Sequence, residues 1–223
     1  MAEYQKIALT ENEKAIFDKE WDPLWTRHFR FREVNDVYQD FKTEILEACE
    51  IAKYQLEGTF GGANCRTNEF GWTSIQPNFL LTGGVASPAA AVYSTSTWNR
   101  YITTANVVSR WIPWIGTSSI SLKLSKYATM IIIGFMDPVD VPKIDAILAK
   151  AKGVDYPIWW LADQLEETDY HVAELPTPIV IEREQEIYLQ TLVGRAGLDK
   201  LRPIGVYFGK GDHLRGKTAY AQT

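Results

Sequence analysis

The stretch Gly211–Thr218 reads GDHLRGKT and matches G-x-x-x-x-G-K-[ST], the pattern of a phosphate-binding loop. In such a loop the backbone N–H groups surround the phosphates, and a following helix points its N-terminus at them. Five residues follow Thr218, too few for that helix or for a later strand carrying a magnesium-binding aspartate. We therefore expect no nucleotide here and interpret the stretch as a basic turn, with Arg215 and Lys217 as candidate contacts to another copy of the chain.

A second group of side chains that could bind a metal ion lies between positions 163 and 174. It consists of Asp163, Glu166, Glu167, Asp169, His171 and Glu174. On a helix face, His171 and a neighbouring glutamate could together hold a divalent cation. A metal site needs further ligands from elsewhere in the fold, and the remaining histidines, His28 and His213, lie in no ligand motif. The pattern favours a solvated helix end, and we expect neither a metal nor another cofactor.

Catalytic patterns are weak throughout the chain. No G-x-S-x-G nucleophile motif occurs. Glu182, Glu184 and Glu186 alternate, which on a strand would place carboxylates about 7 Å apart on one face, close to the separation in glycosidases. Charged residues on an exposed strand face are far commoner and discourage edge-to-edge aggregation. We predict no catalytic residue and a protein that is not an enzyme.

The eight tryptophans are the remaining candidates for binding. Trp159 and Trp160 are adjacent, so they must point in different directions on a helix or a strand, and one of them is available to a partner surface. Aromatic platforms bind sugars or stack on bases, but base stacking normally comes with a basic groove. Most of these rings are expected in the core or in interfaces, and the candidate interaction residues are Trp72, Trp98, Trp111, Trp114, Trp159 and Trp160.

The charge distribution is the most informative global feature. Residues 70–122 contain Arg100 and Arg110 as their only charged side chains and no acid, whereas both flanking regions are densely charged. Prolines, glycines and hydroxyl side chains interrupt this zone, which excludes a membrane helix. A zone that avoids charge is expected to be hidden from water, either inside the fold as a sheet or between subunits, because interface cores are depleted of charge.

The elements that must position these residues follow from their periodicity. Thr10 and Glu13 form a capping box that starts a short helix, and apolar residues at helical spacing predict a second helix over 35–57. The run Tyr127–Met136 predicts a strand buried on both faces. Helices are also predicted at 141–153 and 157–167. Strand-like alternation follows over 177–193, with a last strand at 202–210.

Composition limits the class of protein. A chain of 223 residues with 46% hydrophobic residues is large enough to bury a core without disulfides, and Cys49 is expected to be a small core residue, with Cys65 as its only possible partner. A net charge of −5 gives no strong nucleic-acid signature. No signal peptide or membrane span is recognised, so we expect synthesis in the cytoplasm and a place in a virion or another intracellular assembly.

These observations favour a building block. We expect an α+β protein with a mainly antiparallel β-sandwich, jelly-roll-like in its most specific form, with two N-terminal helices and short inserted helices. Residues 1–58 would form a helical arm and residues 59–223 a β-rich domain. The expected function is self-assembly into a symmetric homo-oligomer, most specifically as a viral capsid or other shell protein. The alternative is a carbohydrate-binding module or glycan-active enzyme that uses the tryptophan-rich loops.

Overall fold

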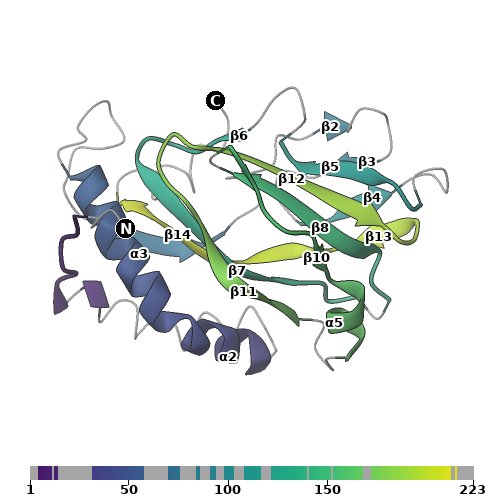
Figure 1. Cartoon of the computed structure of the whole chain (residues 1–223), viewed down its shortest axis with the longest axis horizontal. Helices are drawn as coiled ribbons and strands as arrows, with labels where there is room; N and C mark the ends of the chain where they lie inside the picture. The colour runs from purple at the N-terminus through teal and green to yellow at the C-terminus, as the bar shows by residue number, and fades with distance from the viewer. Residues whose placement is uncertain are drawn as a thin grey trace.

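The described part of this computed structural model contains two facing antiparallel sheets and a smaller third sheet, with the helices of residues 32–56 on one side (Figure 1). The structure describes residues 5–11, 13–14, 32–57, 70–75, 84–85, 91–93, 98–102, 108–116, 122–139, 141–151, 153–167, 172–211 and 214. Within this part of the chain every strand pair is antiparallel. The architecture is therefore α+β and sandwich-like, as the sequence indicated.

The first sheet has the order β1-β14-β7-β11. Its central strand β7 (Ala128–Met136) is buried at all nine positions, which confirms the prediction of a strand hidden on both faces. Strands β14 (Arg202–Lys210) and β11 (Val172–Ile181) flank it, and β1 (Phe70–Ser74) pairs with the outer side of β14. The strand expected at 202–210 is thus also confirmed.

The second sheet has the order β10-β8-β12-β5. Its long strands are β8 (Ile144–Ala151) and β12 (Glu186–Val193). The shorter ones are β5 (Trp111–Ile115), β10 (Trp159–Trp160), β6 (Leu122–Lys123), which pairs with β12, and β9 (Val154–Asp155), which pairs with β8.

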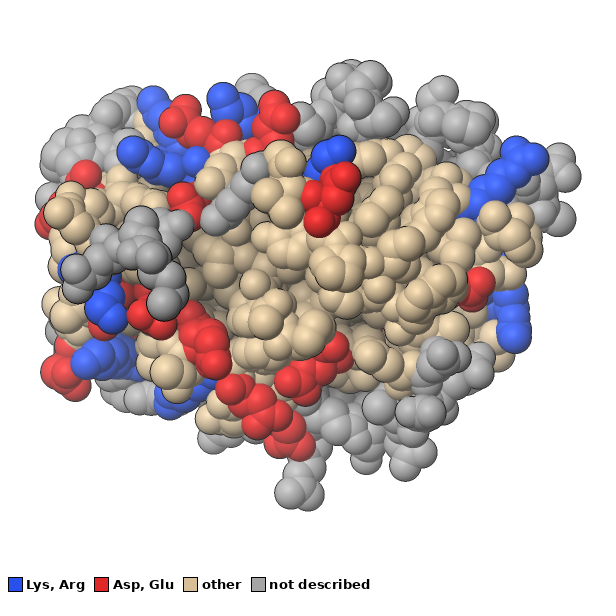
Figure 2. All heavy atoms as spheres, viewed as in Figure 1, with Lys and Arg blue, Asp and Glu red and all other residues tan. Residues whose placement is uncertain are grey.

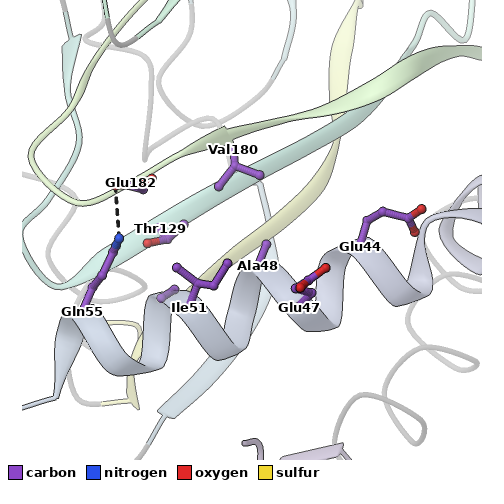
Figure 3. A pocket seen from close by; sticks show the side chains of 9 residues that line it. Glu44, Glu47, Ala48, Ile51, Gln55, Thr129, Val180 and Glu182 are labelled. Carbon is purple, nitrogen blue, oxygen red and sulfur yellow. Dashed lines mark hydrogen bonds between the residues drawn. The ribbon is translucent and has the colours of Figure 1, made fainter. Parts of the chain in front are cut away.

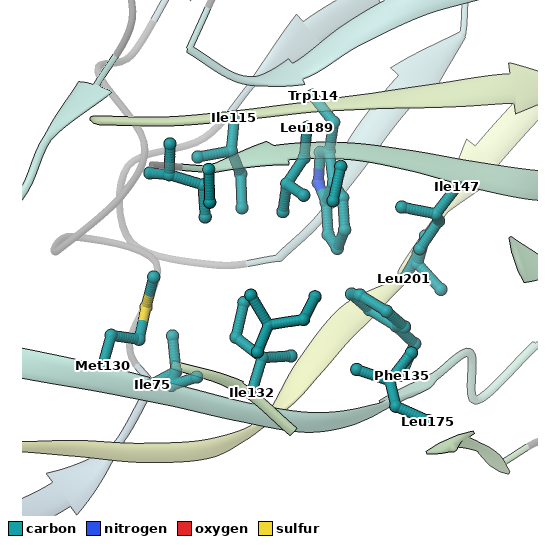
Figure 4. Packing of buried hydrophobic residues seen from close by; sticks show 14 of the residues in the cluster. Ile75, Trp114, Ile115, Met130, Ile132, Phe135, Ile147, Leu175, Leu189 and Leu201 are labelled. Atoms are coloured by element: carbon teal, nitrogen blue, oxygen red, sulfur yellow. The ribbon is translucent and has the colours of Figure 1, made fainter. Parts of the chain in front are cut away.

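The two sheets enclose the larger of the two hydrophobic cores (Figure 4). Trp114 and Leu189 from the second sheet face Met130, Ile132 and Phe135 from the first (Figure 4). The ring centroids of Trp114 and Phe135 are 5.9 Å apart and tilted, a favourable arrangement for aromatic pairs. Each large apolar side chain buried in this way contributes about 1.5–3 kcal/mol relative to exposure.

Helices cover the other face of the first sheet. The expected helix over 35–57 is divided at Phe41 into α2 (Arg32–Asp40) and α3 (Lys42–Leu56). The predicted apolar stripe is buried against β1, β7 and β14, from Val37 and Tyr38 through Ile45 and Cys49 to Leu56. The capping box before them is present as well, because Thr10 N donates to Glu13 Oε2 at 2.7 Å and Glu13 N to Thr10 Oγ1 at 3.3 Å. None of the described helices is both long and apolar enough to cross a membrane.

The helix predicted over 141–153 is wrong, because the structure places strand β8 there. Alanine and lysine favour helix and the apolar spacing fits either period, but both sides of β8 are occupied by strands, β12 and β10. The helix predicted over 157–167 is correct only in its second half, where α5 (Ala162–Glu167) begins after β10. Backbone pairing with neighbouring strands overrode local propensity at both places.

Part of the charge-free zone forms the small third sheet, of order β13-β4-β3-β2. Its strands β2 (Gly84–Val85), β3 (Ala91–Tyr93) and β4 (Arg100–Ile102) come from this zone, and β13 (Gly197–Asp199) joins them from the C-terminal region. The zone also supplies β1 and β5, so its described residues contribute to all three sheets. The expected domain boundary at residue 58 stays a prediction.

A buried hydrogen bond joins the helical layer to the first sheet. The Tyr38 hydroxyl donates to the Gly205 carbonyl oxygen at 2.7 Å, where the register between β14 and β7 shifts.

Replacing Tyr38→Phe should reduce the free energy of unfolding by about 1–2 kcal/mol, because a buried acceptor loses this donor. Urea denaturation measures this loss. The matched control Tyr54→Phe, at a tyrosine 43% exposed on α3, should change stability by less than about 0.5 kcal/mol. Equal losses in the two variants would contradict this role of Tyr38.

Candidate interaction surface

The structure separates the six candidate tryptophans by exposure. Trp72 and Trp114 are buried, while Trp98 and Trp159 are partly buried and packed against the core between the sheets. Trp111 is half-buried, and Trp160 is 57% exposed. The remaining candidates, Arg215 and Lys217, lie outside the described residues.

The prediction that the adjacent tryptophans point in different directions is confirmed. Trp159 packs inward, with its ring centroid 6.5 Å from Phe135 and 5.9 Å from Tyr156. Trp160 is exposed on the other side of the same short strand, as the alternation of side chains along a strand requires.

Trp160 begins a row of apolar side chains that crosses the second sheet from edge to edge. The register pairs Trp160 with Ala146, Ala146 with Leu192, and Leu192 with Trp111. Residues directly opposite each other on antiparallel strands share a face, so all four lie on the side of the second sheet that faces away from the first, where Ala146 is itself fully buried. The row therefore joins the two accessible tryptophans through aliphatic side chains.

A parallel row lies beside the first. Leu148 is opposite Gln190, which is opposite Pro113. The two rows together are called here the outer sheet face and comprise Trp111, Pro113, Ala146, Leu148, Trp160, Gln190 and Leu192. None of these seven residues is charged. The nearest charged side chain in register is Lys150, opposite Tyr188, and it forms a 3.0 Å ion pair with Asp155.

A second exposed apolar pair occurs on the small sheet. Tyr101 on β4 is directly opposite Leu198 on β13, and the two residues are 55% and 41% exposed. Large apolar side chains paired in this way on a solvent-facing strand surface contribute little to the chain's own core. They are candidates for contact with another molecule.

A buried ion pair holds the small sheet against the second sheet. Arg100 on β4 donates from Nε to Asp199 Oδ2 at 2.8 Å and from Nη1 to Thr191 Oγ1 on β12 at 3.1 Å. Arg100 and Asp199 are each 1% exposed, and the guanidinium lies 5.9 Å from the Trp114 ring centroid. One of the two charges in the otherwise charge-free zone is therefore a structural link between sheets.

A second buried carboxyl group, Asp137, follows β7 close to this ion pair. Its Oδ1 accepts from the Val139 N–H at 3.3 Å, and Oδ2 has no hydrogen-bond partner among the described residues. Burial, and then the negative charge of Asp199, raise the pKa of Asp137 to about 7. A proton exchanging near neutral pH suits acid–base catalysis, but the side chain is fully enclosed and cannot meet a substrate.

The other sequence candidates have different outcomes. The prediction that Glu182, Glu184 and Glu186 share a strand face was wrong. Strand β11 ends at Ile181, and Glu184 adopts a positive φ of 58° in the turn before β12. Cys49 is fully buried, as expected, and burial raises the pKa of its thiol well above the usual value. His171 and Cys65 lie outside the described residues. No group of three or more His, Cys, Asp or Glu side chains in the described part could hold a metal.

No family model matches the sequence, and no curated protein matches it significantly. The functional interpretation therefore depends on the outer sheet face and on the residues around it.

Asp137 gives a pH-dependent stability that can be measured. Its pKa is raised from the ordinary 3.8 to about 7, so the folded state binds this proton more tightly than the unfolded state. Stability contributed by the protonated form is therefore lost as pH rises from about 4 to about 7, by an amount on the order of 4 kcal/mol. Asp137→Asn should abolish this contribution and make the chain more stable than the parent at pH 8.

Chemical denaturation at pH 5, 6, 7 and 8 provides the measurement. The control Asp155→Asn removes an exposed carboxylate in an ion pair and should leave the pH profile close to that of the parent. A parent profile that does not fall between pH 5 and 8, or an Asp137→Asn profile parallel to the parent's, would contradict the assignment.

Proposed function

We propose that this chain is a structural subunit that assembles with copies of itself into a symmetric homo-oligomer, most specifically a viral capsid or another protein shell. The single observation that carries the proposal is the outer sheet face, with its two rows of uncharged, mostly apolar residues. One row crosses four strands with Trp160 and Trp111 at its ends, and the other crosses three.

The chemistry of this face differs from that of a solvated one. An antiparallel sheet with one face on the core normally alternates apolar and polar residues, with the polar ones in water. Here Leu148 and Leu192 alternate with inward-facing core residues, so both sides of the second sheet are apolar at these positions. Tryptophan is enriched and charge is depleted at the centre of protein interfaces, which supports burial of this face against another copy.

The sandwich supports the specific form of the proposal. Capsid and shell subunits of jelly-roll type also use two packed antiparallel sheets, and the resemblance is one of architecture alone. In this proposal the loops that join the two sheets follow jelly-roll connectivity. Identical copies would meet through the outer sheet face and through the Tyr101–Leu198 pair, two separate patches of the kind that a closed symmetric assembly needs.

Carbohydrate binding is the second candidate, and the exposure of Trp160 favours it. A solvent-facing indole ring is a platform for the apolar face of a sugar. Four of the six candidate tryptophans are buried or packed against the core, which leaves Trp160 and the half-buried Trp111 as the platform. This candidate predicts a change in tryptophan fluorescence on titration with oligosaccharides, whereas self-assembly predicts none.

The proposal is tested by Trp160→Ser, a change at an exposed site that should leave the fold intact. We expect the concentration at which the chain is half assembled to rise by about tenfold or more, because truncation of a tryptophan that is exposed in the free chain and buried in an interface often costs about 2 kcal/mol or more. Static light scattering over a dilution series measures this. The control Tyr54→Ser removes an exposed aromatic from α3, remote from the second sheet, and should leave assembly unchanged. Identical dilution curves for the parent and Trp160→Ser would contradict the role of the outer sheet face.

A further inference from the structure

A pocket of about 270 Å³ lies between α3 and the edge of the first sheet, on the side of the molecule covered by helices. Ala48, Ile51 and Ala52 line it from the helix, and Val180 lines it from β11 (Figure 3). This apolar lining has room for a short hydrocarbon chain. The pocket is separate from the outer sheet face, which belongs to the other sheet of the sandwich.

Polar groups with unused capacity also line the pocket. Thr129 is 1% exposed on β7, and its hydroxyl has no hydrogen-bond partner among the described residues. The alternation along β7 directs Thr129 toward the helices, on the same side as Ile131 and Ile133. A buried hydroxyl without a partner costs about 1–3 kcal/mol, so a ligand that bonds to it would recover free energy.

The orientation of Gln55 supplies a second acceptor. Its Nε2 donates to Glu182 Oε2 at 3.1 Å, a contact that only the amide nitrogen can make with a carboxylate (Figure 3). The amide oxygen is thereby directed elsewhere, and it is buried without a partner among the described residues. The pocket therefore offers oxygen acceptors from Thr129 and Gln55 beside the Glu182 carboxylate, and its ligand must donate hydrogen bonds.

The charge around the pocket is negative. Glu44, Glu47 and Glu182 line it, and among the described residues Glu47 forms one ion pair, an exposed 3.3 Å contact with Lys6. Figure 2 shows further acidic side chains along α2 and the adjoining part of α3. The field favours a cation over an anion or a neutral molecule.

We propose that this pocket binds a small primary ammonium ion with a short alkyl chain. The ammonium group has three N–H donors, which match the Thr129 hydroxyl, the Gln55 amide oxygen and the Glu182 carboxylate, while the alkyl chain contacts Ile51 and Val180. A divalent metal fits less well, because no three carboxylates among the described residues converge closely enough to hold one. The site is a binding site that does not depend on self-assembly.

Equilibrium dialysis of the full chain against radiolabelled n-butylammonium tests the proposal. We expect one ion bound per chain, displaced by unlabelled n-butylammonium but not by equal concentrations of n-butanol or sodium chloride. Dialysis reports binding whether the chain is a monomer or an assembly, so its result is independent of the proposed structural function.

Two variants and one control assign the residues. Glu182→Gln should weaken binding by about tenfold or more, since it removes a charged hydrogen-bond acceptor. Thr129→Val keeps the side-chain shape and should weaken binding by roughly threefold to tenfold. Glu186→Gln makes the same charge change on β12, outside the pocket lining, and should leave binding within about twofold of the parent.

Three results would overturn the proposal. They are no measurable binding at millimolar n-butylammonium, displacement by n-butanol as effective as by n-butylammonium, and parent-like binding in both Glu182→Gln and Thr129→Val. Thr129→Val also guards against misfolding as an explanation, because replacing an unpartnered buried hydroxyl by a methyl group should maintain or increase the melting temperature.

Discussion

Strand β7 must be kept from water along its whole length and on both faces, and the rest of the fold follows from this constraint. All nine of its residues are buried, so a single covering layer is not enough. The second sheet covers one face with Trp114 and Leu189, and the amphipathic helix α3 covers the other with Ile45 and Cys49. With these two layers in place β7 is fully covered, and the outer sheet face lies on the side of the second sheet that faces away from β7. We therefore assign this apolar face to contacts between copies.

Five charged side chains are buried in the described part of the chain, namely Lys53, Arg100, Asp137, Asp199 and Lys210, and the pair of Arg100 and Asp199 joins two sheets. Arg100 and Asp199 are fully enclosed, and each satisfies the other while Thr191 accepts a further hydrogen bond from the guanidinium. Removing one partner of such a pair leaves a buried charge unpaired, so the small sheet is fixed in position against the second sheet. The enclosed carboxyl of Asp137 adds sensitivity to pH at the same end of the molecule, since its ionisation is opposed by burial and by Asp199.

The sequence predicted those elements whose periodicity had one interpretation. The unbroken apolar run of β7 and the stripe of α3 are examples, and the charge-free zone indicated sheet structure. Residues 144–151 were predicted incorrectly because their apolar spacing fits helix and strand alike, and pairing with β12 decided the outcome. The pocket left no signal, because Thr129 within an apolar strand is typical of a β-branched core residue. The sequence also predicted that Trp159 and Trp160 point in opposite directions. It could not predict which of them faces solvent, because that depends on which side of the second sheet packs against the first.

Sedimentation velocity of the unmodified chain, over a dilution series from high to low micromolar concentration, tests the central claim of self-assembly most directly. The account predicts a large assembled species that gives way to smaller species on dilution, as expected for copies held by a repeated interface. A single species of 25.4 kDa at every concentration would contradict it, because the outer sheet face would then remain exposed to water in the native protein.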